Sequence, residues 1–286
     1  MHTYAVLTAV ATFLLIIAGG LVTSTDSGLA VPDWPLSYGT WFPPMVGGIL
    51  YEHGHRMIAA TVGLMMLGLA IWLWRVEPRA WVRRLGYVAL GAVVLQGLLG
   101  GLTVLLLLPP PVSIAHATLG PTVFCLIVCI AQVTAPSWTA QRARDEDTGW
   151  PSLRALGLAL AMLATLQLIL GAILRHTGGG LAWHLAGAVC LIATWGWLMQ
   201  RIRQPQGVLH PLRSSAQRLG RLLVLQIVLG GFSWWGRAHV GIVTLHVGMG
   251  ALVLSQAVVL AWQTCRTTSP KRIVVGVAMA SERVAS

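Results

Sequence analysis

Eight long apolar segments follow one another along the chain, separated by shorter polar connections. Each is close to the run of about 20 apolar residues that a helix needs to cross the hydrocarbon core of a membrane. The segments cover residues 3–23, 51–74, 82–108, 113–134, 153–174, 182–200, 217–235 and 239–263. This pattern predicts an all-α integral membrane protein with eight transmembrane helices.

Composition supports the membrane assignment, because 56% of the 286 residues are hydrophobic and only 9% are charged. A soluble domain carries far more charge. The formal net charge of +11 would suggest a nucleic-acid partner in a soluble protein, but here the positions of the basic residues matter more than their sum. We therefore expect membrane lipid around the chain and no nucleic acid.

Most of the Lys and Arg residues lie on one side of the predicted membrane. Sixteen of the 19 Lys and Arg residues lie after the second, fourth, sixth and eighth segments. Because basic connections stay in the cytoplasm, both termini are predicted to be cytoplasmic. The opposite side keeps Arg56, Arg175 and Arg237, each next to a helix end. They are candidates for a binding site, where an arginine can pair with acidic groups of a ligand, or, alternatively, for simple anchoring at the membrane interface.

The four cysteines lie within helices or at the cytoplasmic end, at positions 125, 129, 190 and 265. None can form a disulfide outside the cell, and we interpret them as small apolar residues. The first apolar segment has no basic region before it and its sequence recurs inside the chain, so we assign it to the fold and not to a signal peptide.

The chain contains an internal repeat. Residues 95–101 recur as 225–231, and residues 116–120 match 246–250, both with an offset of 130. The ends of the first and fifth segments, residues 19–29 and 171–181, match with an offset of 152. Four helices per half is an even number, so the halves have the same orientation. The expected architecture is two pseudo-symmetric four-helix bundles.

The repeat divides the chain into four parts. We expect an N-terminal bundle over 1–134, a cytoplasmic linker over 135–152, a C-terminal bundle over 153–265 and a cytoplasmic tail over 266–286.

The histidines follow the repeat. Each half places one on its second helix and one on its fourth: His55 with His116, and His184 with His246. Two imidazoles facing each other across a four-helix core, without thiolates or further carboxylates, suit the axial positions of a haem iron. A lone buried histidine is more often structural, but two repeat-related pairs favour haem ligation.

The first half alone has a carboxylate beside its histidine. On a helix Glu52, His55 and Arg56 share one face, and ionisable groups at membrane depth usually bind or react with something. In the second half of the repeat, the positions equivalent to Glu52 and Arg56 are Leu181 and Leu185. The alternative interpretation is an ion pair of Glu52 with Arg56 at a helix end.

The first outer loop differs between the halves as well. It spans 24–50 in the first half, with Asp26, Asp33, Trp34 and Trp41, and only about seven residues in the second. A reacting half needs a group that handles protons and a lid, whereas a half that holds a cofactor needs neither. The alternative is a plain connector with aromatic interface anchors.

These features together resemble the haem A synthase family, over about residues 5–263. The resemblance rests on the Glu52-x-x-His55-Arg56 motif, on the loop from Asp26 to Leu36 and on the remaining histidines, His116, His184 and His246. It implies an oxidoreductase that oxidises the C8 methyl of haem O to the formyl group of haem A for cytochrome oxidase assembly.

The resemblance also implies roles for residues. Glu52 would be the catalytic carboxylate, and His55 and His116 would flank the substrate haem O, with Arg56 on the substrate side. His184 and His246 would hold a cofactor haem b, so all four histidines would be axial ligands of haem iron. The implied location is the bacterial plasma membrane, and the implied partners are a haem O synthase and an electron carrier.

One departure from the family pattern is visible. Many members have a cysteine pair in the first outer loop, where this sequence has Val31 and Ser37. Two other functions stay open. One is a dihaem b-type cytochrome that relays electrons, but this function does not explain Glu52 and the long loop. The other is a haem-binding carrier, but this function does not explain two histidine pairs.

Overall fold

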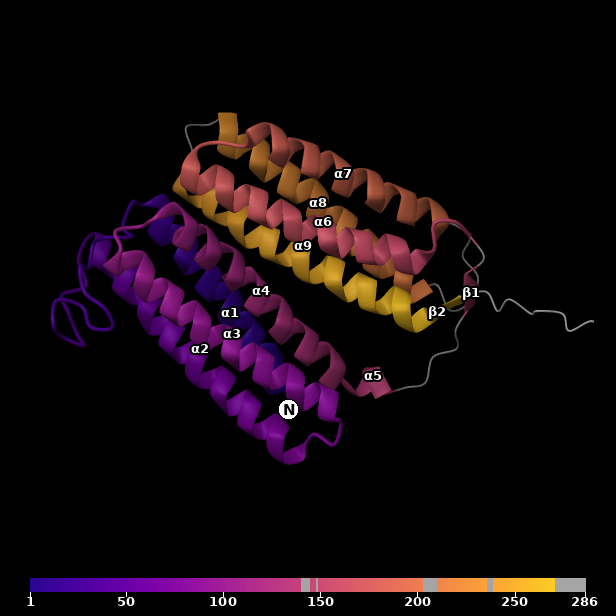
Figure 1. The fold of residues 1–286 in the computed structure, drawn as a ribbon, viewed down its shortest axis with the longest axis horizontal. Helices are drawn as coiled ribbons and strands as arrows, with labels where there is room; N and C mark the ends of the chain where they lie inside the picture. The colour runs from indigo at the N-terminus through magenta and orange to yellow at the C-terminus, as the bar shows by residue number, and fades with distance from the viewer. Residues whose placement is uncertain (140–144, 148, 203–209, 236–238, 271–286) are drawn as a thin grey trace, which may run out of the picture.

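The computed structural model of the chain describes residues 1–139, 145–147, 149–202, 210–235 and 239–270. All eight predicted helices are present, with ends close to the expected ones (Figure 1). They are α1 (His2–Ser24), α2 (Gly48–Val76), α3 (Ala80–Leu105), α4 (Pro110–Thr134), α6 (Leu153–Thr177), α7 (Leu181–Arg201), α8 (His210–Trp235) and α9 (Val240–Thr267).

Three short elements were not expected from the pattern of apolar residues. Helix α5 (Pro136–Thr139) follows α4, and strand β1 (Asp145–Asp147) pairs in parallel with β2 (Thr268–Pro270). The predicted linker and tail lie partly outside the described residues, so their full extent stays a prediction.

Several helices begin or end at residues that typically start or stop a helix. Helix α4 begins at Pro110, whose fixed φ angle suits the first turn of a helix. The hydroxyl of Ser152 accepts a hydrogen bond from the backbone N–H of Ala155 at 3.1 Å and caps the start of α6. Helix α6 stops at Gly178, which has a left-handed φ of 72°, a conformation that glycine adopts readily.

Seven helices are long and apolar enough to cross a membrane, so the described part of the chain is a multi-pass membrane protein by length and composition. Helix α8 is not among the seven. Its first half carries Arg213, Arg218 and Arg221, which lower the mean hydropathy of the helix. The predicted eighth crossing is therefore not established by the apolar length of α8.

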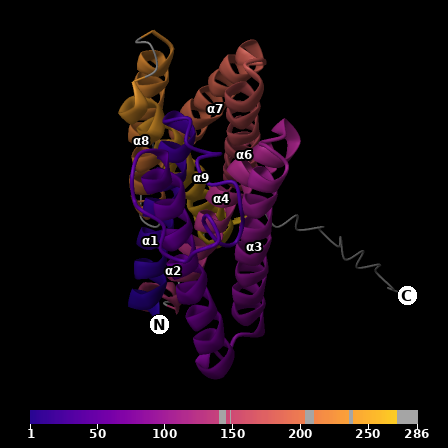
Figure 2. The same cartoon turned by 90° about the vertical axis from the view of Figure 1, so that its left-hand side faces the viewer.

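The helices pack in two groups (Figure 1). Helices α1–α4 contact one another in one group and α6–α9 in the other, while α4 and α9 lie between the groups and contact each other (Figure 2). Gly157 on α6 allows close approach to α9, because a Cβ atom there would lie 3.1 Å from Cα of Ala261. Small residues of this kind let membrane helices gain van der Waals contact.

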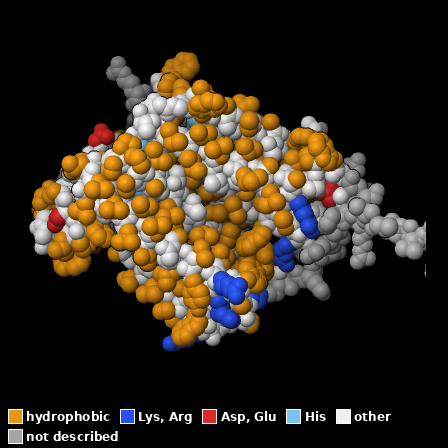
Figure 3. Space-filling view, viewed as in Figure 1, with side chains coloured by type: hydrophobic (Ala, Val, Ile, Leu, Met, Phe, Trp, Pro, Cys, Tyr) orange, Lys and Arg blue, Asp and Glu red, His pale blue; other side chains and the backbone are white. Residues whose placement is uncertain are grey.

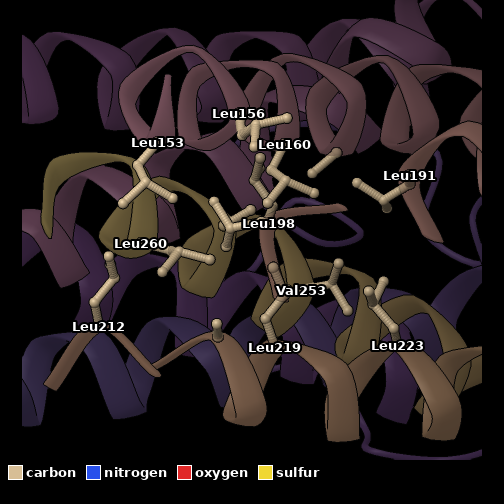
Figure 4. Close-up of a cluster of buried hydrophobic side chains, with 14 of the residues drawn as sticks. Leu153, Leu156, Leu160, Leu191, Leu198, Leu212, Leu219, Leu223, Val253 and Leu260 are labelled. Atoms are coloured by element: carbon tan, nitrogen blue, oxygen red, sulfur yellow. The ribbon is translucent and has the colours of Figure 1, made fainter. Parts of the chain in front are cut away.

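Each group encloses its own cluster of buried apolar side chains. In the second group the cluster includes Leu160, Leu198 and Leu219, each fully buried (Figure 4). A matching cluster in the first group includes Met66 and Ile127. Both clusters lie further along the helices than the histidines, toward the end of the molecule that carries α5, β1 and β2.

On the face drawn in Figure 3, Lys and Arg side chains gather at the end of the molecule that carries α5, β1 and β2. At this end Glu77 forms an ion pair of 2.6 Å with Arg79. Arg79 also donates to the carbonyl oxygen of Val133 at 2.9 Å and so links the α2–α3 connection to the end of α4. Hydrogen bonds from Arg79 hold the pKa of Glu77 below its usual range.

Candidate functional site

At the opposite end, Glu52 lies on the second turn of α2 and is only 3% exposed. Its Oε1 accepts a hydrogen bond from the guanidinium of Arg56 at 2.6 Å, one helical turn further on. Its Oε2 accepts from the backbone N–H of Val31 at 2.8 Å. Burial of a carboxylate requires such partners. The ion pair that the sequence offered as an alternative is therefore present.

Arg56 also holds the first outer loop, which connects α1 to α2. One of its terminal nitrogens donates to the carbonyl oxygens of Asp33 at 2.7 Å and of Leu36 at 2.8 Å. A guanidinium presents five donors in a fixed plane, so one side chain can bind several carbonyls at once. This use of Arg56 was missed at the sequence level, because it depends on the path of the loop.

Two further contacts fix the same loop to the helices below it. The hydroxyl of Ser37 lies 2.7 Å from Nδ1 of His53, and both residues are buried. The indole ring of Trp34 lies over Gly101 on α3, where a Cβ atom would come within 2.6 Å of the ring. Val31 and Ser37, the positions at which the chain departs from the expected family pattern, are held by noncovalent contacts to α2.

Asp33 organises the outer turn of the loop. Its carboxylate accepts hydrogen bonds from the backbone N–H groups of Gly39 at 2.8 Å and Tyr38 at 2.6 Å. These bonds, that of Gly39 first, lower the pKa of Asp33 below the usual range of an aspartate. The hydroxyl of Tyr38 donates to the carbonyl oxygen of Ala30 at 2.7 Å and closes the turn.

The four predicted histidines occupy equivalent positions on α2, α4, α7 and α9, and all are partly buried. Each imidazole packs against a glycine of the preceding long helix. A Cβ atom added to the glycine would lie 3.0–3.1 Å from Cε1 of the ring. The pairs are Gly19 with His55, Gly100 with His116, Gly171 with His184, and Gly230 with His246.

The histidines also interact in the two predicted pairs. His55 and His116 lie within electrostatic range of each other, and so do His184 and His246. Within the described residues no three His, Cys, Asp or Glu side chains cluster in a way that could hold a bare metal ion. Each half presents two imidazoles, the number that an iron already bound by four porphyrin nitrogens could accept.

Three glutamines accompany these histidines, and the sequence analysis gave them no role. Gln96 donates to the carbonyl oxygen of His116 at 3.0 Å, and Gln167 donates to that of His184 at 2.9 Å. Gln226 contacts the ring of His246 at 3.3 Å. The signal was present as glutamine four residues before three of the four packing glycines, at Gln96, Gln167 and Gln226.

The second half has no counterpart to the carboxylate and the long loop. Leu181 begins α7, and only residues 178–180 connect it to α6. Near this connection Arg175 donates to the hydroxyl of Ser24 at 2.9 Å and links α6 to the end of α1. Arg237, the third arginine predicted on this side, lies outside the described residues.

The cysteines are free, as expected, and Cys125 and Cys129 are buried inside α4. A small cavity of about 40 Å³ lies at the other end of the molecule, lined by residues such as Gln132, Trp138 and Gln263. It is remote from the histidines and adds nothing to the site.

Comparison with known proteins gives consistent results. The family model of the COX15-CtaA cytochrome oxidase assembly proteins matches residues 2–47 and 46–186. This region includes Glu52, His55, His116 and His184. His246 lies beyond it, and its relation to the other histidines rests on the internal repeat.

Several curated proteins are similar to the chain. A heme A synthase of Symbiobacterium thermophilum is 30% identical over 78% of this chain and 70% of its own length. One of Bacillus licheniformis is 26% identical over 62% of this chain and 59% of its own length. One of Shouchella clausii is 25% identical over 88% of this chain and 82% of its own length.

Proposed function

The chain belongs to the COX15-CtaA family of cytochrome oxidase assembly proteins, and we propose that it is a membrane oxidoreductase that converts haem O into haem A. The C8 methyl of haem O is oxidised to a formyl group, and the product serves cytochrome oxidase assembly. The observation that carries the detailed assignment is the asymmetry between two otherwise equivalent halves: each has a histidine pair, but only the first has a buried carboxylate and a long loop tied to it.

In this proposal all eight long helices cross the bacterial plasma membrane, α8 included, as two pseudo-symmetric bundles. The clustered arginines near α5, β1 and β2 favour a cytoplasmic location for that end (Figure 3). His2 supports an N-terminus at the same end, because its Nδ1 lies 2.9 Å from the carbonyl oxygen of Ala131 near the end of α4. The outer loop and the histidines then face the other side.

We assign the first bundle, residues 1–134, to the substrate haem O and the second, residues 153–265, to a cofactor haem b. Residues 135–152 and 266–286 are the linker and the tail. The two halves contact each other through α1 and α4 on one side and α6 and α9 on the other, and α4 and α9 carry His116 and His246. Direct contact between the halves suits the passage of electrons from one to the other.

The second half fits a permanently bound haem. Nδ1 of His246 lies 3.1 Å from the carbonyl oxygen of Gln226, which can accept the ring N–H. This bond fixes the ring with its proton on Nδ1. Nε2 lies 3.3 Å from the amide nitrogen of Gln226, which would have to give way to iron. His184 and His246 would hold the group, and when bound it would supply a redox centre that takes electrons from the substrate.

In the first half, His55 and His116 would flank the substrate haem. Glu52 would accept the proton that leaves as the methyl is oxidised. Its position is set by Arg56 and by the N–H of Val31, which orient the carboxylate. Arg56 would act on the substrate side by holding the loop, and its Nε–H, which makes none of these bonds, is left for a propionate.

The loop would act as a lid. Trp34 covers the end of α3 at Gly101, and a hydrogen bond from Arg56 holds the turn around Asp33 against α2. A closed loop would control how water reaches the reacting methyl group, whose conversion to a formyl group requires an oxygen atom. A haem O synthase would supply the substrate, and an electron carrier would reoxidise the second half.

The proposed function is tested by extracting the pigments of the full-length protein purified from a host that makes haem O. The proposal expects haem B together with haem O, its hydroxylated product or haem A. Haem B alone, in both halves, would instead favour an electron-relaying cytochrome. Haem O bound but never converted would favour a carrier.

A further inference from the structure

The outer end of α1 lies between the first histidine pair and the second half. Gly19 packs against the imidazole of His55, as described above. The next residue, Gly20, faces α9, where a Cβ atom added to it would lie 3.1 Å from Cγ2 of Thr244. Small residues of this kind let two membrane helices approach closely. This end of α1 therefore contacts the candidate site on one face and the second half on another.

Ser24, the last residue of α1, is held by two helices of the second half. Its hydroxyl oxygen accepts a hydrogen bond from Nη2 of Arg175 on α6 at 2.9 Å and another from the hydroxyl of Thr244 on α9 at 3.3 Å. Ser24 follows Gly20 by four residues, so both lie on the same face of α1 and meet Thr244, which is only 2% exposed. Asp26, two residues into the loop, lies within electrostatic range of Arg175. The base of the first outer loop is thus attached to the second half.

The internal repeat does not account for these bonds. With the offset of 152 the residue equivalent to Arg175 is Thr23, and with the offset of 130 the residue equivalent to Thr244 is Ile114. The hydroxyl of Thr23 donates inside its own helix, to the carbonyl oxygen of Gly19 at 3.2 Å, and isoleucine has no hydrogen-bonding group. Arg175 and Thr244 are therefore particular to the second half, although both of their bonds end on the first.

A short hydrogen-bonded segment connects Ser24 to Glu52. The backbone N–H of Ser27 donates to a carbonyl oxygen in the last turn of α1 at 2.9 Å, and that of Ala30 donates to the carbonyl oxygen of Ser27 at 3.1 Å. Val31 follows at once, is fully buried and donates its N–H to the carboxylate of Glu52 at 2.8 Å. Because the segment is short and bonded to the helix end, a displacement of Ser24 is expected to reach Val31.

We propose that Arg175 and Thr244 are positioning residues for the oxidation of haem O, which act from the second half on the carboxylate of the first. They fix Ser24, and through residues 24–31 they fix the N–H group that orients Glu52. The inference rests on the proposed function. It gives the second half a task besides holding a haem, because the reacting half depends on it for the placement of its own carboxylate.

The test uses the full-length protein with the haems it carries. Ser24→Ala removes the acceptor of both bonds without altering the second half, and Ser24→Thr keeps the hydroxyl. Thr23→Ala is the matched control, because the hydroxyl of Thr23 bonds within α1. Thr244→Val removes one of the two bonds from the other side and serves as the second variant if Ser24→Ala does not fold.

Three readouts separate a local effect on Glu52 from a general loosening of the protein. Hydrogen exchange of the Val31 amide reports the bond to the carboxylate directly. Exchange of the Tyr38 and Gly39 amides, which bind Asp33, reports the rest of the loop. The kcat and KM for haem O, with the content and spectrum of haem b in the same sample, report the reaction and the second half.

In Ser24→Ala the exchange of the Val31 amide is expected to rise about tenfold, the change in a local equilibrium that loss of one hydrogen bond to a charged group produces. The kcat is expected to fall by a similar factor at unchanged KM, because the histidines still bind the substrate haem. Thr244→Val should change both in the same direction by less. Thr23→Ala and Ser24→Thr should match the wild type, and haem b and the exchange of Tyr38 and Gly39 should not change in any of the four.

Wild-type exchange of Val31 and wild-type kcat in both Ser24→Ala and Thr244→Val would overturn this inference and leave the proposed function intact. So would a fall in kcat that is matched by loss of haem b or by equal exposure of the Tyr38 and Gly39 amides, because Ser24 would then act on packing as a whole. Wild-type protein that binds haem O and never converts it would overturn the proposed function and this inference with it.

Discussion

The carboxylate of Glu52 accepts a hydrogen bond from the backbone N–H of Val31 at 2.8 Å, although the two residues lie 21 positions apart. This bond joins the one buried carboxylate of the outer end to the loop that covers it. The loop and the carboxylate therefore form one structural unit, and variants in one are expected to affect the other.

Arg56→Gln is expected to release the first outer loop. The variant loses the bonds from Arg56 to the carbonyl oxygens of Asp33 and Leu36 and the ion pair with Glu52. Hydrogen bonds to charged groups contribute about 1.5–3 kcal/mol each, so local opening should become frequent. Limited proteolysis of residues 25–47 measures this opening, and an unchanged cleavage rate would show that Arg56 does not hold the loop.

The turn around Asp33 is expected to loosen in acid. The pKa of Asp33 is lower in the folded protein than in the unfolded chain, so its bonds stabilise the turn at pH values above the unfolded pKa of about 4. This contribution is lost as the pH falls through the lower, folded pKa. Hydrogen exchange of the Tyr38 and Gly39 amides, corrected for intrinsic rates, should show reduced protection there.

Asp33→Asn is the control for this pH dependence, because asparagine keeps one acceptor oxygen but has no charge to lose. Its exchange should not change over the same acid range. If the wild type and Asp33→Asn show the same pH profile, the carboxylate does not control the turn.

The second histidine pair should carry a low-spin b-type haem. The wild-type protein is expected to give a reduced-minus-oxidised spectrum of that type, and a variant with both His184→Ala and His246→Ala is expected to lose it, because the iron then has no axial ligand in that half. Full haem B content in the double variant would show that these histidines are not the ligands.

Reporter fusions test the proposed membrane orientation. Fusions within 75–81 and 201–216 are expected to report the cytoplasm, and fusions within 24–50 the outside, because of the distribution of basic residues. A further fusion within 236–239, which follows α8, tests whether α8 crosses the membrane. An outside signal from either basic connection would contradict the orientation of the site.

Much of this molecule could be predicted from its sequence. The lengths of the apolar segments were enough to predict eight helices. A segment that crosses lipid must satisfy its own backbone hydrogen bonds, and a helix does so. The repeat predicted which histidines are equivalent, and the structure brings His55 near His116 and His184 near His246. The assignment of each pair to a particular haem stays a proposal.

Other features could not be predicted because they depend on tertiary contacts. The bonds from Arg56 to the carbonyl oxygens of Asp33 and Leu36 require the loop to fold back over α2, and no local pattern specifies that path. The glutamines were visible in the repeated stretch around Gln96 and Gln226. Their contacts with the histidine of the following helix depend on how the two helices pack and are seen only in the structure.

The role of Glu52 needs to be separated from its structural contacts, and Arg56→Gln provides the comparison. Glu52→Gln keeps an oxygen for the N–H of Val31 but cannot take a proton. Arg56→Gln keeps the carboxylate and breaks the ion pair. If Glu52 only anchors the loop, the two variants should lose activity to the same extent.

The most direct measurement is the rate of conversion of haem O to haem A by Glu52→Gln, with the haem content of the protein determined in the same sample. Loss of proton transfer typically lowers a rate by about 10²–10⁴, so we expect haem O or a hydroxylated intermediate to accumulate on a protein that still binds haem. The loss should exceed that of Arg56→Gln. Haem A formation by Glu52→Gln at a near wild-type rate would contradict the account, because the first half would then react without its carboxylate.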